Sequence, residues 1–129
     1  DVLVLDAFRG AAPPLHLMTR EAFAIYVASM ADDGILAVNM ELDTFNVAPL
    51  QRGLANALGL SVRWFESGSD DNYCDDFTVN WALYTKDLGF FRSPNVRRAM
   101  SQWPDGGISE LVWTDADANL LRIINWRSK

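Results

Sequence analysis

The stretch DVLVLDAFRGAAPPLHLMTREAF, residues 1–23, decides the fold class. Its run VLVL at 2–5 is short, continuous and aliphatic, which is typical of a strand covered on both faces of a parallel α/β sheet. A loop rich in glycine and proline follows Asp6. Thr19 is then placed to be the N-cap of a helix that has Phe23 on its apolar side. This order predicts a strand that leads through a loop into a helix.

The next segments continue this alternation. Residues 34–40 (GILAVNM) predict a second buried strand, and the apolar positions within 47–58 predict an amphipathic helix that Gly59 closes. Residues 61–67 alternate as a third strand, and residues 77–85 form a fourth strand after a hairpin-like loop. We therefore expect a βαβαββ unit, half of an open α/β sheet, whose last strand runs antiparallel to the others.

The final third of the chain predicts smaller elements. A proline-started helix is expected over residues 95–103, and a short strand followed by a helix is expected in ELVWTDADANLLRIINW, residues 110–126. The 129 residues, 50% of them hydrophobic, have the length and composition of one domain with a packed core. We therefore treat residues 1–129 as a single, partial domain.

Charge and composition limit the partners and the compartment. The net charge of −6 argues against nucleic acid or an anionic membrane as the main partner and fits a cationic small molecule. The single Cys74 cannot form an internal disulfide, as in reducing compartments. No apolar run reaches the roughly 18–20 residues that span a bilayer, and no signal-peptide pattern is present. We expect a cytoplasmic chain, and a membrane segment elsewhere in a longer parent protein is compatible with this.

Two side chains near the first strand could carry chemistry. Asp6 lies where that strand ends, and open α/β sheets bind ligands at the carboxyl ends of their strands. Its carboxylate could accept a proton or hold an ammonium group; equally, it could cap the loop by accepting backbone N–H bonds. His16, the only histidine, lies between two leucines. It is a candidate general base, although a partly buried, hydrogen-bonded structural role is the commoner use of such a histidine.

Further acidic residues are weaker candidates. Glu41 and Asp43 follow the second strand and are expected to face the same crevice as Asp6. Asp115 is a candidate for that crevice too, but Thr114 or Asp115 could instead be a helix N-cap. Four acidic residues form a cluster that resembles a cation site: Asp70, Asp71, Asp75 and Asp76. Their spacing is not that of an EF-hand loop, so a solvated loop is the favoured interpretation.

Several familiar motifs are absent. There is no second histidine or further cysteine at metal-ligand spacing, so no metal site is expected. There is also no G-x-G-x-x-G, Walker, G-x-S-x-G or H-E-x-x-H motif. The sequence therefore gives no support to a phosphate-cradling loop or a nucleophile elbow.

Four stretches together resemble the second half of the spermidine synthase family, the polyamine aminopropyltransferases, and in particular a bacterial spermidine-synthase-like branch. They are residues 1–23, 32–40 (DDGILAVNM), 48–60 (APLQRGLANALGL) and 112–124 (VWTDADANLLRII). The most specific parts are LDAF-x-G-x-x-x-P-x-HL-x-T-x-EAF and WTD-x-x-x-NLL. The resemblance covers nearly the whole chain.

The resemblance implies a class I methyltransferase-like, Rossmann-like fold: a seven-stranded sheet with helices on both faces and one antiparallel strand. This chain would supply the part from the fourth strand onward. In the family, a Gly-rich loop and a ribose-binding acid in the first half hold decarboxylated S-adenosylmethionine. Because this sequence lacks both, we expect no cofactor in this chain alone, and decarboxylated S-adenosylmethionine or S-adenosylmethionine as co-substrate of the parent protein.

The resemblance also implies residue roles. Asp6 matches the catalytic acid that helps to deprotonate the attacking amine of putrescine, and Asp6 with Ala7 would adjoin the nucleoside co-substrate. His16, Glu41 and Asp115 are the expected substrate-binding residues. The family has a second acid three residues after the first, where this sequence has Arg9. This departure leaves two alternatives open: a non-catalytic assembly or sensing domain, and an S-adenosylmethionine-dependent methyltransferase with another substrate.

A half-sheet leaves the edge of its first strand, residues 2–5, without a neighbour. Unpaired backbone groups along an edge are a template for pairing, and exposed apolar surface favours association. We expect this edge to be covered by the missing N-terminal half of the domain or by another copy of the chain in a homo-oligomer.

Overall fold

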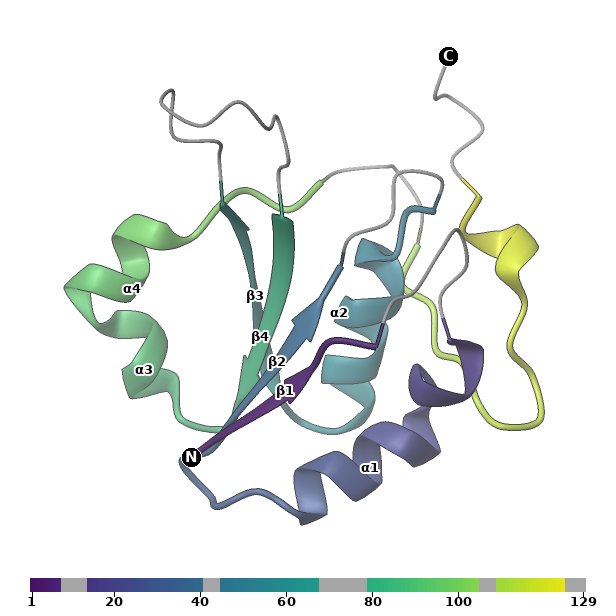
Figure 1. Ribbon diagram of the computed structural model, residues 1–129, viewed down its shortest axis with the longest axis horizontal. Helices are drawn as coiled ribbons and strands as arrows, with labels where there is room; N and C mark the ends of the chain where they lie inside the picture. The colour runs from purple at the N-terminus through teal and green to yellow at the C-terminus, as the bar shows by residue number, and fades with distance from the viewer. Residues whose placement is uncertain (8–13, 41–44, 68–78, 105–108, 125–129) are drawn as a thin grey trace.

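The computed structural model describes residues 1–7, 14–40, 45–67, 79–104 and 109–124 (Figure 1). These residues form a mixed α/β structure in which four strands make a mixed sheet and four α-helices flank it. The α/β class predicted from the sequence is confirmed. Within the described ranges, no helix is both long enough and apolar enough to cross a membrane.

The strands lie in the order β1-β2-β4-β3. β1 (Val2–Leu5) pairs in parallel with β2 (Ile35–Asn39). β4 (Val79–Thr85) runs antiparallel to β2 and also to β3 (Ser61–Ser67), between which it lies. The predicted antiparallel direction of the last strand is therefore confirmed, and β1 and β3 form the two opposite edges of the sheet.

The helices divide between the two sides of the sheet (Figure 1). α1 (Arg20–Ala28) and α2 (Ala48–Ala57) lie on one side, and α3 (Leu88–Arg92) and α4 (Pro94–Ala99) lie on the other. α1 begins as predicted, because the Thr19 hydroxyl accepts a hydrogen bond from the Ala22 N–H at 3.2 Å.

The main core lies between the sheet and the pair α1 and α2. The strand register sets Leu36 of β2 beside Tyr84 of β4, and Val38 beside Ala82, and all four side chains are fully buried. Leu3 and Leu5 of β1 pack against the edge of this cluster. Because successive side chains of a strand point to opposite faces, Val2 and Val4 are turned toward the other face.

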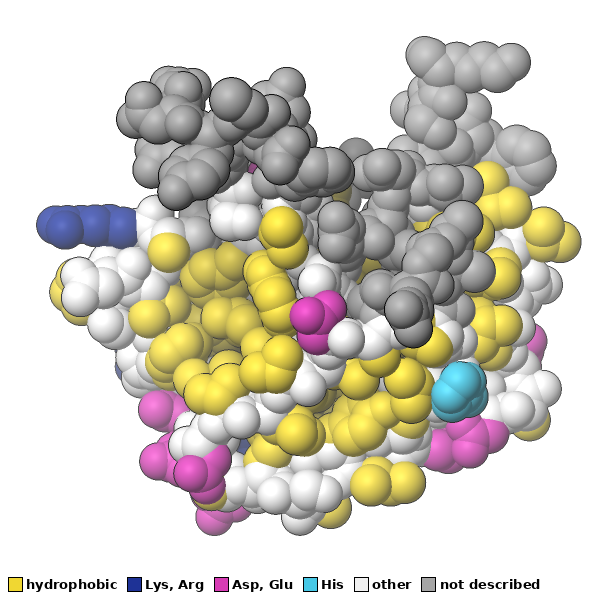
Figure 2. Space-filling view, viewed as in Figure 1, with side chains coloured by type: hydrophobic (Ala, Val, Ile, Leu, Met, Phe, Trp, Pro, Cys, Tyr) yellow, Lys and Arg dark blue, Asp and Glu magenta, His cyan; other side chains and the backbone are white. Residues whose placement is uncertain are grey.

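The prediction that β1 is covered on both faces is wrong for this chain. β1 is an edge strand, and the side chains of Val2 and Val4 are 63% and 55% exposed. A continuous aliphatic run indicates that the side chains on both faces of a strand favour burial. Other elements have to pack over those faces, however, and no described residue packs over the face of Val2 and Val4. Figure 2 shows hydrophobic side chains gathered between α3 and α4 on one side and β1 on the other.

The C-terminal third also differs from the prediction. The helix expected over 95–103 ends at Ala99, because the chain then turns to pair with β3, where the Ser101 N–H donates to the Trp64 carbonyl at 2.9 Å. In the described part of 110–126 neither the expected strand nor an α-helix forms. Thr114 and Asp117 close a tight turn instead, and η2 (Leu120–Arg122) is a single 3-10 turn.

Candidate functional site

Asp6 and Asn39 meet at the carboxyl ends of the two parallel strands. The register pairs Leu5 of β1 with Val38 of β2, so the next residue of each strand lies at the same edge. The Asn39 Nδ2 donates a hydrogen bond of 2.9 Å to the Asp6 Oδ1. Asn39 is only 6% exposed, whereas Asp6 is exposed. A buried amide therefore holds one carboxylate oxygen, and no described residue bonds the other.

This arrangement suits the recognition of a cation. An ionised carboxylate only accepts hydrogen bonds, and Asn39 is a neutral donor, so the pair keeps the negative charge of Asp6 while fixing its orientation. The free oxygen is available to an ammonium group or to a proton. The pair lies where open α/β sheets bind ligands, and Ala7, the other predicted co-substrate contact, follows with a small, exposed side chain.

Several predicted residues lie outside the described part of the chain. Glu41, predicted to bind substrate, and its neighbour Asp43 are among them, as is Arg9. The acidic cluster 70–76 and Cys74 within it are outside it too. Among the residues that are described, no group of three His, Cys, Asp or Glu side chains could hold a metal ion.

His16 lies in the short 3-10 helix η1 (Leu15–Leu17), which connects the segment after β1 to α1. The imidazole is exposed, and it makes no hydrogen bond or ion pair with a described residue. The structure therefore does not give it the partly buried, hydrogen-bonded role that was one of the two interpretations. No described contact joins it to Asp6.

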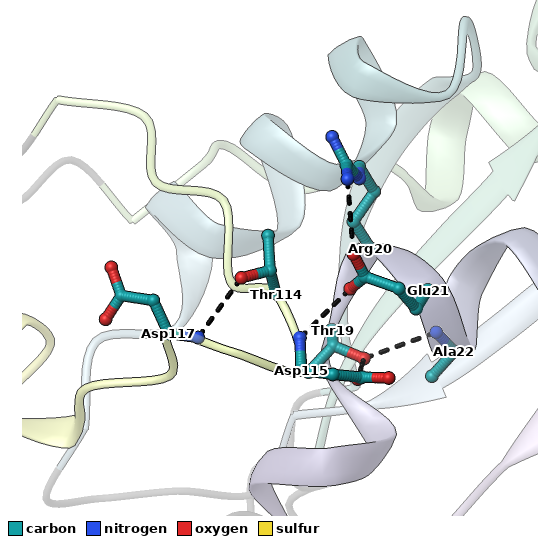
Figure 3. A network of polar contacts seen from close by, with 7 residues as sticks. All are labelled: Thr19, Arg20, Glu21, Ala22, Thr114, Asp115 and Asp117. Carbon is teal, nitrogen blue, oxygen red and sulfur yellow. Dashed lines mark hydrogen bonds and ion pairs between the residues drawn. The ribbon is translucent and has the colours of Figure 1, made fainter.

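Asp115 forms part of a polar network that joins the C-terminal segment to the start of α1 (Figure 3). The Thr19 hydroxyl donates a hydrogen bond of 2.6 Å to the Asp115 Oδ1. The Asp115 N–H in turn donates to the Glu21 Oε2 at 3.1 Å, and the Arg20 N–H donates to the Trp113 carbonyl at 2.8 Å. These contacts give Asp115 a tethering role between two segments, and no described contact brings it to Asp6.

Glu21 completes this network. Its Oε1 lies 3.2 Å from the Arg20 Nη2, while its Oε2 accepts from Asp115. The pKa of Glu21 is lowered, first by a hydrogen bond from its own backbone N–H. Desolvation, the second-largest effect, opposes this, and the Asp115 N–H and Arg20 lower the pKa further. The ionised form of Glu21 is therefore the form that the folded chain favours.

The role of Asn39 in holding the Asp6 carboxylate was not predicted from the sequence. This residue ends a buried strand, ILAVN, where a lone polar residue is a signal of a polar partner nearby. The partner itself depends on the register between β1 and β2, which a single sequence does not give.

Comparison with known proteins adds no relative. No family model, no curated protein and no solved structure matches the chain. The residues and their geometry therefore carry the functional argument.

Proposed function

We propose that this chain is the second half of a spermidine-synthase-like domain, in which Asp6 receives the amine of a polyamine such as putrescine and the complete protein transfers an aminopropyl group from decarboxylated S-adenosylmethionine. The observation that carries the proposal is the Asp6 carboxylate at the carboxyl ends of two parallel strands, with one oxygen held by the buried Asn39 and the other not bonded by any described residue.

The sheet supports this proposal. A parallel β1 and β2 followed by an antiparallel β4, with helices on both sides, is compatible with half of a class I methyltransferase-like sheet. The net charge of −6 favours a cationic ligand over an anionic one at this edge.

The chemistry assigned to Asp6 is the acceptance of a proton. An amine attacks the aminopropyl carbon only in its neutral form, so the carboxylate helps to remove a proton from the ammonium group. The new C–N bond then forms as the bond from that carbon to the sulfonium sulfur breaks, which leaves a neutral thioether. Asn39 acts as a positioning residue because it holds Asp6 and does not touch the amine in this scheme.

The exposed side of β1 has a role in the same proposal. One backbone edge of β1 has no partner among the described residues, and Val2 and Val4 beside it are exposed. A strand from the first half of the domain would pair with this edge and bring the nucleoside co-substrate to Asp6 and Ala7. In the isolated 129-residue chain, a second copy is the available occupant.

A second candidate is a non-catalytic assembly or ligand-sensing domain. It is favoured by Arg9, which stands where the resemblance expects a second acid, and by Asp115, whose carboxylate is already engaged by Thr19. Among the described candidates only Asp6 then has a carboxylate oxygen without a described partner, so a diamine would be held there at one end.

Calorimetric titration separates these functions. Putrescine, decarboxylated S-adenosylmethionine and S-adenosylmethionine would each be titrated into the 129-residue chain and into the longest natural form of the protein, each as wild type, as Asp6→Asn and as the control Asp117→Asn. Asp117 is a suitable control because its exposed carboxylate makes no hydrogen bond with a described residue. The same variants would then be tested by mass spectrometry for an aminopropyl product, in the longest natural form of the protein.

We expect putrescine binding that Asp6→Asn abolishes and Asp117→Asn leaves unchanged. Equal binding by wild type and Asp6→Asn contradicts the proposal. Binding of S-adenosylmethionine without its decarboxylated form indicates a methyltransferase instead. Binding of an amine without any transfer favours the sensing domain.

A further inference from the structure

A hollow of about 240 Å³ lies at the far edge of the sheet from β1, between α2 and β3. α2 contributes one helical face to its wall, and the first residues of β3 contribute another part. Trp103 and Glu110 from the C-terminal third close it. Because β1 and β3 are opposite edges, this hollow is separate from the site at Asp6.

Arg52 is the distinctive residue of the hollow. Its guanidinium carbon lies 5.8 Å from the centre of the Trp103 ring, and its Nε is buried with no hydrogen-bond partner. No carboxylate of the described residues forms an ion pair with it. Buried N–H groups in folded proteins are nearly always paired, so an unpaired one on a charged side chain calls for a partner that the described residues do not supply.

The other charged groups of the described lining, Arg63 and Glu110, already have partners. Arg63 and Ser61 of β3 line the hollow, and Arg63 uses one of its five N–H donors on the Val62 carbonyl at 2.8 Å. Glu110 is the only acid among the described residues of the lining, and its Oε2 already accepts a hydrogen bond of 2.6 Å from the Asn56 Nδ2. The Arg63 guanidinium carbon lies 5.3 Å from the centre of the Phe91 ring of α3, so Arg52 is the main cation of the described lining.

The size of the hollow limits what can enter it. Its volume of about 240 Å³ is the share of roughly eight molecules in liquid water, and it lies below the range of about 300–1,000 Å³ that is usual for drug-sized ligands. A phosphate or carboxylate group is small enough to enter it. The planar fork of a guanidinium matches the oxygens of either group.

We propose that this hollow binds a small oxyanion, a phosphate or carboxylate group, through the guanidinium of Arg52 with support from the Ser61 hydroxyl. The anion is either a free ion or the charged end of a small metabolite. This inference goes beyond the proposed function, because it concerns an anionic ligand at the opposite edge of the sheet and does not depend on Asp6.

NMR titration of the ¹⁵N-labelled 129-residue chain tests it. Inorganic phosphate, glycerol 3-phosphate and acetate would be added at constant ionic strength, with chloride as the reference anion. The variants are Arg52→Gln, Arg52→Lys, which keeps the charge and the apolar stem, and the control Arg98→Gln, which removes an equal charge from an exposed position of α4. The dispersion of each spectrum reports whether the variant is folded.

We expect saturable shifts at Asn56, Ser61 and the Trp103 indole N–H. Affinity should fall about tenfold or more in Arg52→Gln and less in Arg52→Lys, and stay unchanged in Arg98→Gln. Tighter binding of glycerol 3-phosphate than of phosphate assigns the site to a metabolite end group, and the reverse assigns it to the free ion. Shifts that do not saturate, that chloride reproduces, or that persist in folded Arg52→Gln overturn the proposal.

Discussion

The Thr19 hydroxyl donates a hydrogen bond of 2.6 Å to the Asp115 carboxylate, across 96 positions of sequence. The same oxygen of Thr19 accepts from the Ala22 N–H and so caps α1. One buried hydroxyl therefore caps α1 and also anchors the C-terminal segment to the start of this helix. That segment contributes Trp113 to the core, so the bond joins the N-terminal part of the chain to the segment that completes the core.

Replacing Thr19 by valine should destabilise the fold through both roles. Valine has a similar shape but neither accepts from Ala22 nor donates to Asp115, so we expect a loss of about 1–3 kcal/mol in the free energy of unfolding. Urea denaturation monitored by circular dichroism measures this loss. Thr19→Ser is the matched control, because it keeps the hydroxyl. If the two variants are equally stable, the hydroxyl does not have these roles.

Glu21 should make part of the stability depend on pH. Its pKa in the folded chain is lower than its ordinary value of 4.5, so ionised Glu21 stabilises the fold above about pH 4.5, and this contribution is lost as the pH falls through the folded pKa. The stability advantage of the wild type over Glu21→Gln should therefore shrink between pH 6 and pH 3, as urea denaturation at each pH would show. Glu66→Gln, at an exposed carboxylate without a described hydrogen bond, is the control. Parallel stability curves for wild type and Glu21→Gln would refute the prediction.

Gly53 lies where the C-terminal segment crosses α2. A Cβ at this position would be 1.9 Å from the Leu111 carbonyl oxygen, and the neighbouring Leu111 N–H donates to the Pro49 carbonyl at 3.2 Å. Backbone atoms cannot yield as a flexible side chain can, so Gly53→Ala should cost about 3 kcal/mol or more.

Gly59→Ala is the comparison for this variant. Gly59 has φ +65° but open space around its Cα, so alanine there should cost only about 1–2 kcal/mol through backbone strain. Thermal unfolding should rank wild type above Gly59→Ala and Gly59→Ala above Gly53→Ala. The reverse order of the two variants would mean that the Leu111 segment does not lie against α2.

The elements with strong local signals could be predicted from the sequence. β3 at Ser61–Ser67 has the predicted bounds, Thr19 caps α1, and Gly59 follows the end of α2 with positive φ. In each case the physical cause lies within one turn or strand. The causes are the alternation of side chains along β3, a side-chain acceptor before α1, and the ability of glycine to adopt positive φ.

The features that depend on distant residues could not be predicted. The aliphatic run of β1 does not reveal that its Val4 face is exposed among the described residues, because burial of that face depends on packing by other segments. The bond between Asp6 and Asn39 depends on strand register. In the C-terminal segment, the Asn119 side chain accepts a hydrogen bond from the Leu121 N–H and caps a 3-10 turn, where an α-helix was expected. Such a side chain competes with the helix for backbone N–H groups.

The proposal that the sheet continues beyond β1 is tested most directly by sedimentation velocity of the 129-residue chain over a range of concentrations. We expect self-association that Val4→Lys weakens, since lysine on an edge strand opposes pairing. Val112→Lys, at a valine that is 39% exposed elsewhere on the surface, should leave the self-association unchanged. A chain that remains monomeric at every concentration, with or without lysine at position 4, would contradict the proposal.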